Sequence, residues 1–287
     1  MSSYIEPTAN LSEAWLRTLE HVVEAGGREV NVITTITDPL APEVPVIRAA
    51  LDNVLSVERG GVRVQSVDTV AGTIFPRDIY ADTGLTFAPG MDEEALAKLD
   101  ASAADLYACY AEMLPILTTD QANNRGTYFG RMISWPGKTG GGTNQIADRI
   151  KRFRAVRQRD VGQRNLEDIV VAGEAELLDE PAWDAPAGLQ VYAASDRRER
   201  GFPCLVHVDL TLYKRRISMA ATYRHQYLVT KAYGNLLGLS RLLGFLAQQT
   251  GFEVGELMIN ATFADAEHGN YSKAGVAQLM AAARSAQ

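Results

Sequence analysis

Hydrophobic residues recur every three or four positions in several segments of the chain, which is the spacing of a helix with one buried face. The first such segment is followed by Gly26-Gly27, and another opens with the acidic residues Asp92, Glu93 and Glu94, as helix ends and starts commonly do. We therefore predict helices over 11–25, 44–55, 92–114 (stopping at Pro115), 144–159 and 272–286.

Other segments are rich in β-branched and aromatic residues and are bounded by turn residues, which is typical of strands. Two of them are separated only by Lys214-Arg215-Arg216, a spacing that predicts an antiparallel hairpin. Strands are predicted over 29–36, 127–135, 189–194, 204–213, 217–223 and 257–263, whereas the short apolar runs of 62–87 cannot be assigned by periodicity.

Segment 232–249 is apolar on nearly every helical face, so we expect a helix that other elements cover on all sides. It carries Arg241 in its middle and falls short of the roughly 20 apolar residues that a membrane span needs. The whole pattern predicts an α+β fold, with a large mixed β-sheet packed with helices around one central buried helix. We expect a single domain over 1–287, with an acidic insertion at about 160–187.

The amino-acid composition of the chain makes some classes of function less suitable than others. The chain has 287 residues, of which 46% are hydrophobic and 22% charged, as in ordinary globular proteins. Its net charge of −7 disfavours binding to nucleic acid or to an anionic membrane surface. The only cysteines, Cys109 and Cys204, cannot form a disulfide framework, and no secretory signal is visible, so a reducing cytoplasm is expected.

Three polar patterns have ordinary explanations. Gly137-Lys138-Thr139 lacks the preceding glycine of a phosphate-binding loop, so we interpret it as a surface loop. The cations between Arg149 and Arg159 interleave with apolar residues at helical spacing, which indicates a helix with one packed face. No histidine has the spacing of a metal site, and Asp265, Glu267 and His268 are interpreted as solvated charges at the end of a strand.

Cys204 leaves two interpretations open. A lone cysteine at the start of an apolar strand is most often a small buried hydrophobe. A reactive cysteine needs an electropositive surrounding, and Arg197, Arg198 and Arg200 come just before it. Arg224 lies on the paired strand of the hairpin, where antiparallel pairing would bring a cation back toward the thiol and lower its pKa.

These residues resemble the thymidylate synthase family. Pro203-Cys204 opens a strand, Arg224 lies where the hairpin returns, and Asn235 lies near the start of the following helix, all at the family's spacing. The helix then leads into Gly-Phe-Glu-Val-Gly-Glu-Leu (251–257), an ending typical of the family. The resemblance is good over about 188–263 and weak over 11–36 and 127–153.

The resemblance implies a mechanism in which Cys204 adds to carbon six of a uracil-type pyrimidine nucleotide or nucleoside and carbon five then takes a methyl or hydroxymethyl group. Methylenetetrahydrofolate is the one-carbon donor in that family. Arg224 would lower the thiol pKa and hold a phosphate oxygen, Asn235 would bind the edge of the base, and Gln145 matches a family helix start. A homodimer through the back of the sheet is also implied.

The chain departs from the family around this core. Leu205 follows the cysteine where the family has histidine, and His225 replaces a phosphate-binding serine. Tyr227 replaces the aspartate that contacts the folate pterin, and the arginines that reach a phosphate across the dimer are missing. Arg197, Arg198 or Arg200 could compensate, since they come just before the Cys204 strand. Cys204, Arg224 and Asn235 are retained while the residues around them have changed. This favours a substrate that differs from the family's.

Three hypotheses therefore stand. The first is a divergent transferase of thymidylate synthase type acting on carbon five. The second is a scaffold of the same kind that binds a nucleotide or nucleoside without folate-dependent methyl transfer. In the third, Cys204 is merely packing and does not react with iodoacetamide.

Overall fold

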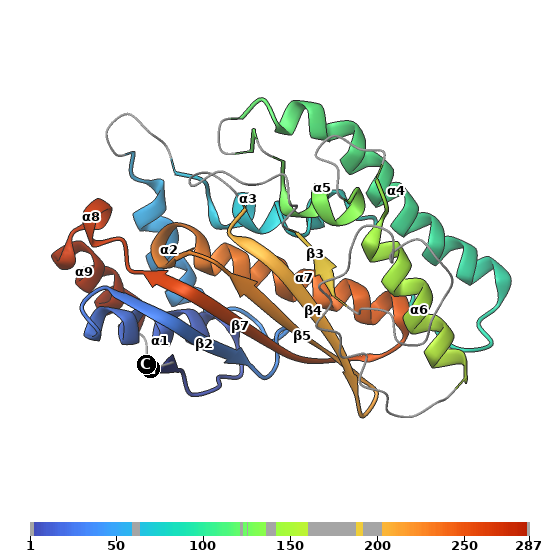
Figure 1. The fold of residues 1–287 in the computed structure, drawn as a ribbon, viewed down its shortest axis with the longest axis horizontal. Coiled ribbons are helices and arrows are strands. Elements are labelled where there is room, and N and C mark those ends of the chain that lie inside the picture. Colours follow the sequence, from blue (N-terminus) through green and yellow to red (C-terminus); the bar gives the residue numbers. More distant parts are fainter. Residues whose placement is uncertain are drawn as a thin grey trace.

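A computed structural model describes residues 3–58, 64–120, 123–124, 126–135, 142–159, 188–191 and 203–285. In this part of the chain seven strands form one mixed sheet in the order β1-β2-β7-β5-β4-β3, with β6 beside β7 (Figure 1). The predicted mixed sheet packed with helices is thus confirmed. The strands are β1 (Ser3–Tyr4), β2 (Arg28–Ile36), β3 (Leu189–Gln190), β4 (Leu205–Tyr213), β5 (Arg216–Tyr223), β6 (Gln226–Tyr227) and β7 (Glu253–Asp265).

The pairing of the strands decides which ends meet. β4 and β5 form the predicted antiparallel hairpin, β5 runs parallel to β7, and β7 runs antiparallel to β2. The start of β4, the end of β5, the end of β7 and the start of β2 therefore lie at one end of the sheet. We call this the Cys204 end, because Cys204 immediately precedes β4.

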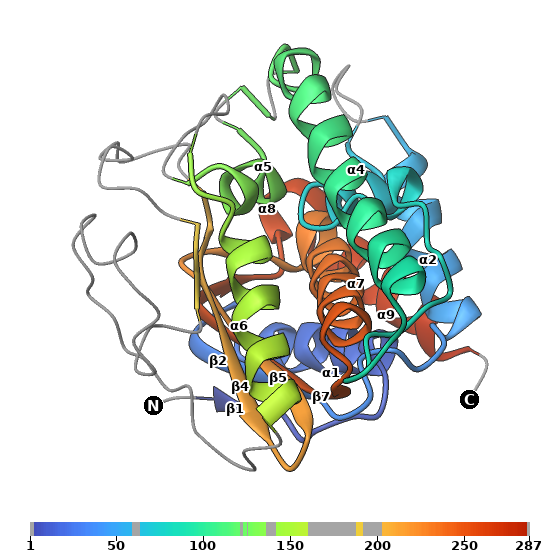
Figure 2. The same ribbon diagram turned by 90° about the vertical axis from the view of Figure 1, so that its right-hand side faces the viewer.

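The helices are amphipathic or fully buried as their patterns require. They are α1 (Leu11–Glu24), α2 (Pro45–Ser56), α3 (Val67–Gly72), α4 (Glu93–Leu117), α5 (Tyr128–Ile133), α6 (Gln145–Arg159), α7 (Tyr233–Thr250), α8 (His268–Tyr271) and α9 (Lys273–Arg284), with the 3₁₀ turn η1 (Arg77–Ile79) and the π-helical turn η2 (Leu228–Ala232). Figure 2 shows the described helices gathered on one side of the sheet, with α7 among them.

Helix α7 is the predicted central helix. All its residues except Arg241, Gly244 and Gln248 are buried, so it packs on every side. It ends at Gly251, whose φ of 73° is the left-handed conformation that glycine adopts without steric cost. No described helix is both long and apolar enough to cross a membrane.

The two faces of the sheet differ along its cross-strand rows. The row Leu210, Met219, Leu257 and Ile36 is buried beneath the helices. The adjacent row Asp209, Ala220, Met258 and Thr35 points the other way and is only partly covered. The alternation places one face of each strand in the core.

Helix α1 ties the helical layer to the turn before α7. Its N-cap Asn10 accepts a hydrogen bond from the Glu13 amide, as the sequence of a capped helix requires. The indole of Trp15 donates to the Leu228 carbonyl at 2.7 Å, which holds the first residue of η2.

Several predictions were wrong. The segment predicted as a strand over 127–135 contains helix α5, in which Thr127 is an N-cap that accepts from the Gly130 amide. The helix expected to stop at Pro115 continues to Leu117. The strand predicted over 257–263 begins earlier, at Glu253. The insertion predicted at 160–187 lies outside the described residues.

Candidate functional site

Cys204 lies at the open end of the β4–β5 hairpin, opposite its turn, and is half-buried. Its carbonyl accepts a hydrogen bond from the Arg224 amide at 2.8 Å, and the next residue, Leu205, pairs with Tyr223. The predicted return of the arginine to the cysteine is therefore present in the backbone. The Arg224 side chain is exposed at this end of the sheet.

Aromatic side chains enclose the cysteine from the core side. The Tyr128 hydroxyl of α5 accepts hydrogen bonds from the main chain of Leu205 and Cys204. Tyr223 is fully buried, and its hydroxyl has no hydrogen-bond partner among the residues that the structure describes. Burial raises the pKa of both phenols, so both stay neutral and present hydroxyls beside the thiol.

The electrostatics at Cys204 differ from the sequence-based expectation. Burial raises the pKa of the Cys204 thiol, and this outweighs the lowering effects of Arg224 and Lys231. The cation predicted to lower the pKa is in place, but the sequence could not show how deeply the sulfur lies. In the protein alone the thiol is therefore mostly protonated at neutral pH.

Asn235 lies in the first turn of α7 and is only 4% exposed. Its side-chain amide makes no hydrogen bond with any described residue. Gly234 packs against Val70 of α3, and Leu236 lines a cavity on the sheet side. Because successive helical residues are about 100° apart, Asn235 projects between α3 and the sheet, on the flank that it shares with Lys231.

His225 and Tyr227 form an aromatic stack beside the site. The His225 ring lies 4.3 Å from the Tyr227 ring and 5.0 Å from the Phe263 ring, centroid to centroid. Burial lowers the pKa of His225 despite the nearby Asp265 carboxylate, so the imidazole is neutral at pH 7. A neutral ring is a weak substitute for a phosphate-binding cation, whereas the stack offers an aromatic surface.

For the remaining predicted site residues, the structure shows at most which elements carry them and which elements lie next to those. Gln145 is the buried first residue of α6, and α6 packs against α5, whose Tyr128 touches the Cys204 main chain. The role of Gln145 at the site stays a prediction. Arg197 and Arg198 lie outside the described residues.

Two functional candidates were missed or misjudged from the sequence. Asp265 and Glu267 were expected to be solvated, yet they are only 7% and 4% exposed. The carboxylate of Glu267 accepts hydrogen bonds from the Val229 amide, the Thr230 amide and the Thr230 hydroxyl, at 2.8, 2.8 and 2.9 Å. It holds η2, which carries the unpredicted Lys231. The tripeptide Asp-Ala-Glu at a strand end gave no signal of burial.

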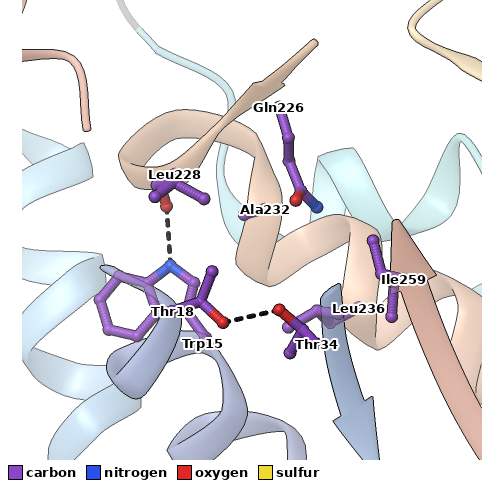
Figure 3. A pocket seen from close by; sticks show the side chains of 8 residues that line it. All are labelled: Trp15, Thr18, Thr34, Gln226, Leu228, Ala232, Leu236 and Ile259. Carbon is purple, nitrogen blue, oxygen red and sulfur yellow. Dashed lines mark hydrogen bonds between the residues drawn. The ribbon is translucent and has the colours of Figure 1, made fainter. Parts of the chain in front are cut away.

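A cavity lies next to η2 on the sheet side (Figure 3). Its free volume of about 10 Å³ suits a single water molecule, and Thr18, Thr34 and Gln226 supply polar groups to its wall. The Thr18 and Thr34 hydroxyls lie 2.8 Å apart. The cavity is too small for a ring.

The side chains around Cys204 limit which cofactor or metal the site can hold. No cluster of three or more metal-binding residues occurs among the residues that the structure describes. The resemblance implies a carboxylate for the folate pterin, and Tyr227 stands there instead. The nearest carboxylates are engaged, Asp265 with Arg28 at 3.0 Å and Glu267 with η2. The described residues therefore do not fit folate in the family's manner.

No protein-family model matches the chain, and neither does any curated protein sequence. Among solved structures, the chain is similar to the crystal structure of thymidylate synthase from T4 phage, with 12% sequence identity and a TM-score of 0.33. The match covers 47% of this chain and 39% of that one. A likeness of this extent says nothing about activity or substrate.

Proposed function

We propose that the chain is a divergent transferase of thymidylate synthase type, which adds Cys204 to a uracil-type pyrimidine and makes carbon five of the ring reactive. The observation that carries this proposal is the half-buried Cys204 at one end of the sheet, where the Arg224 amide returns to its carbonyl at 2.8 Å, while Asn235 is buried in the first turn of α7. Each matches a residue of the family pattern in the sequence.

The residues can perform the first step as follows. The Cys204 thiolate forms a bond to carbon six, and the electron pair of the C5=C6 bond moves onto carbon five and the neighbouring carbonyl oxygen. The Asn235 amide both donates and accepts, so it fits the alternating edge of uracil. Arg224 is exposed, so its guanidinium would meet an anionic oxygen of the ligand at the surface, and its charge lowers the pKa of the Cys204 thiol.

The second step needs an electrophile for carbon five. When a proton from water adds to carbon five, loss of the original carbon-five proton and breaking of the bond between carbon six and the Cys204 sulfur return the starting ring with an exchanged hydrogen. When a one-carbon unit adds instead, the same loss of the carbon-five proton and release of the Cys204 thiolate give a ring with a new substituent. The described carboxylates do not fit folate. The experiment below therefore compares the reaction with and without this one-carbon donor.

A second candidate function is a scaffold that binds a pyrimidine nucleotide or nucleoside without methyl transfer. The raised pKa of the Cys204 thiol favours it, because a protonated thiol does not add. The stack of His225 on Tyr227 would then serve only to hold the base.

Tritium release separates these functions. We would incubate the protein with uridine and deoxyuridine monophosphates labelled with tritium at carbon five, with and without methylenetetrahydrofolate. Release without folate indicates addition of the thiol, and a folate-dependent increase indicates transfer. Cys204→Ala should reduce release to background with an unchanged melting temperature, whereas the matched control Cys109→Ala should keep it. Wild-type release equal to that of Cys204→Ala would reject the transferase.

We also propose a homodimer through the back of the sheet, as the resemblance implies. Among the described elements, no helix lies over this face, which carries small or β-branched side chains such as Thr35, Ala220 and Thr222 around Met258. Such a face can pack closely against a second copy.

A further inference from the structure

The cavity beside η2 has both polar and apolar side chains in its wall (Figure 3). Three of the eight lining residues are polar: Thr18 of α1, Thr34 of β2 and Gln226 of β6. A cavity lined only by apolar groups stays dry, whereas polar groups without partners hold water in a cavity of sufficient size. What this cavity can bind therefore depends on the hydrogen bonds that its three polar side chains leave unmade.

The two threonine hydroxyls leave one oxygen free to accept a hydrogen bond. Thr18 donates its only hydroxyl hydrogen to the Ala14 carbonyl of its own helix at 2.7 Å. In the 2.8 Å contact between the two hydroxyls, Thr34 must therefore be the donor. The Thr34 oxygen keeps its lone pairs for a further hydrogen bond, and Thr34 is only 5% exposed, so bulk solvent scarcely reaches it.

Gln226 brings a buried carboxamide to the same cavity. It is 4% exposed, and its side chain makes no hydrogen bond with any described residue. Figure 3 shows this side chain extending from β6 toward Thr34 and Leu236, with the amide at its tip. A buried amide without a partner is unfavourable, because it has given up its hydrogen bonds to solvent. The amide can both donate and accept, so it can bind a water molecule in either orientation.

We propose that the cavity is a binding site for one water molecule, which bridges the Gln226 carboxamide and the Thr34 hydroxyl. The free volume of about 10 Å³ holds one water, and the two side chains supply the two partners that a buried water needs. The water donates to the Thr34 oxygen and forms its second hydrogen bond with the carboxamide. This site does not depend on the proposed function, because the cavity and its polar wall are the same whether or not Cys204 reacts.

The water bridge fixes β6 and with it the aromatic stack. β6 is two residues long and pairs with the end of β7 through Gln226 and Tyr227. Because neighbouring residues of a strand point to opposite sides, His225 and Tyr227 point away from the cavity, and their rings stack 4.3 Å apart. The water adds a link from β6 to β2, which lies on the other side of β7. Gln226 and Thr34 are thus positioning residues for the stack.

Oxygen-17 magnetic relaxation dispersion of the full-length protein counts the water molecules that stay bound for longer than the protein takes to tumble. Thr34→Val and Gln226→Met remove the hydrogen-bonding atoms at similar side-chain size, and each should lower the count by one. Because both residues bind the same molecule, the double variant should lose one water and not two. Thr35→Val is the matched control, because Thr35 lies on the other face of β2, and it should keep the wild-type count.

The titration of His225, followed by NMR, reports on the position of the stack. Burial lowers the pKa of His225, with Asp265 acting to raise it and Arg28 acting to lower it. When loss of the water lets β6 move, the ring gains contact with solvent. Its pKa should then rise toward the ordinary 6.5 in Thr34→Val and Gln226→Met, and stay unchanged in Thr35→Val.

Each outcome decides one part of the assignment. An unchanged water count in both single variants would overturn the water site, and a loss of two waters in the double variant would overturn the bridge. A lost water with a wild-type titration of His225 would leave the site in place and reject the positioning role. If the melting curve shows one single variant to be unfolded, the other decides against the same control. Failure of the proposed function is recognised separately, by tritium release.

Discussion

Replacing Glu267 by alanine tests how the turn before α7 is held. The carboxylate is 4% exposed and is the hydrogen-bond acceptor for the amides of Val229 and Thr230. Alanine keeps the backbone but removes the acceptor. The two amides then lie near the buried start of α7 without a partner, while the Thr230 hydroxyl can rotate elsewhere.

The expected loss of stability follows from those two amides. An unsatisfied buried donor costs about 1–3 kcal/mol, so Glu267→Ala should lower the free energy of unfolding by about 2–6 kcal/mol. Glycine at this position removes the same acceptor but relieves the left-handed strain, since φ is 58°. Glu267→Gly should therefore be about 1 kcal/mol more stable than Glu267→Ala.

Urea unfolding followed by circular dichroism measures these differences. Glu267→Gln, which keeps an acceptor oxygen, is the matched control and should lose the least at pH 7. Burial raises the pKa of the Glu267 carboxyl above its ordinary 4.5 in the folded state. The unfolded chain then holds fewer protons than the folded one, so this group lowers stability as pH rises from about 4.5 through the folded pKa. Glu267→Gln should lack that decline.

An alanine variant within about 1 kcal/mol of the wild type would refute the role of Glu267 in holding η2. A glycine variant no more stable than alanine would refute the strain. The two results together would mean that η2 holds its shape without Glu267.

Two further predictions concern recognition and assembly. Asn235→Asp should shift ligand preference from uracil to cytosine nucleotides, because a carboxylate accepts from the cytosine amino group, and a larger thermal shift with uridine than with cytidine monophosphate in this variant would contradict it. Met258→Arg places a charge on the back of the sheet, where Met258 is 36% exposed, and should convert a dimer to a monomer in light scattering, with Lys214→Glu as a surface control that stays dimeric.

The sequence predicted the elements whose patterns are long and unambiguous. The run 232–249 is apolar at every turn, so only a covered helix suits it, and α7 is that helix. The hairpin of β4 and β5 was visible because alternating β-branched residues flank a short basic turn. In such segments local pattern and tertiary packing favour the same structure.

Errors arose where a short segment satisfies two periods. Segment 127–135 has apolar residues spaced for either a strand or a helix, and burial of Phe129, Met132 and Ile133 against neighbouring elements decides for α5. Pro115 does not stop α4, because it removes only its own amide donor, and the Thr118 amide still closes the last turn on the Leu114 carbonyl at 3.0 Å.

The residues of the candidate site also fall into those that the sequence could predict and those that it could not. Cys204, Arg224 and Asn235 could be proposed because their spacing matches a family pattern, and strand pairing brings the first two together. Gln226 and Glu267 could not, because their importance comes from burial and from contacts between segments far apart in the chain. The sheltering of the thiol, which reverses the expected direction of its pKa, is likewise a property of packing alone.

The π-helical turn η2 is a point at which the chain can differ in length by one residue. A π turn contains one residue more than an α turn would need, so deleting a single residue from 228–232 would let the backbone continue as an ordinary helix. The residues on either side would keep their directions, because the π turn takes up its additional residue within a single widened turn. Homologous chains that are one residue shorter here should accordingly have an α turn in place of η2 and keep the position of Asn235 on α7.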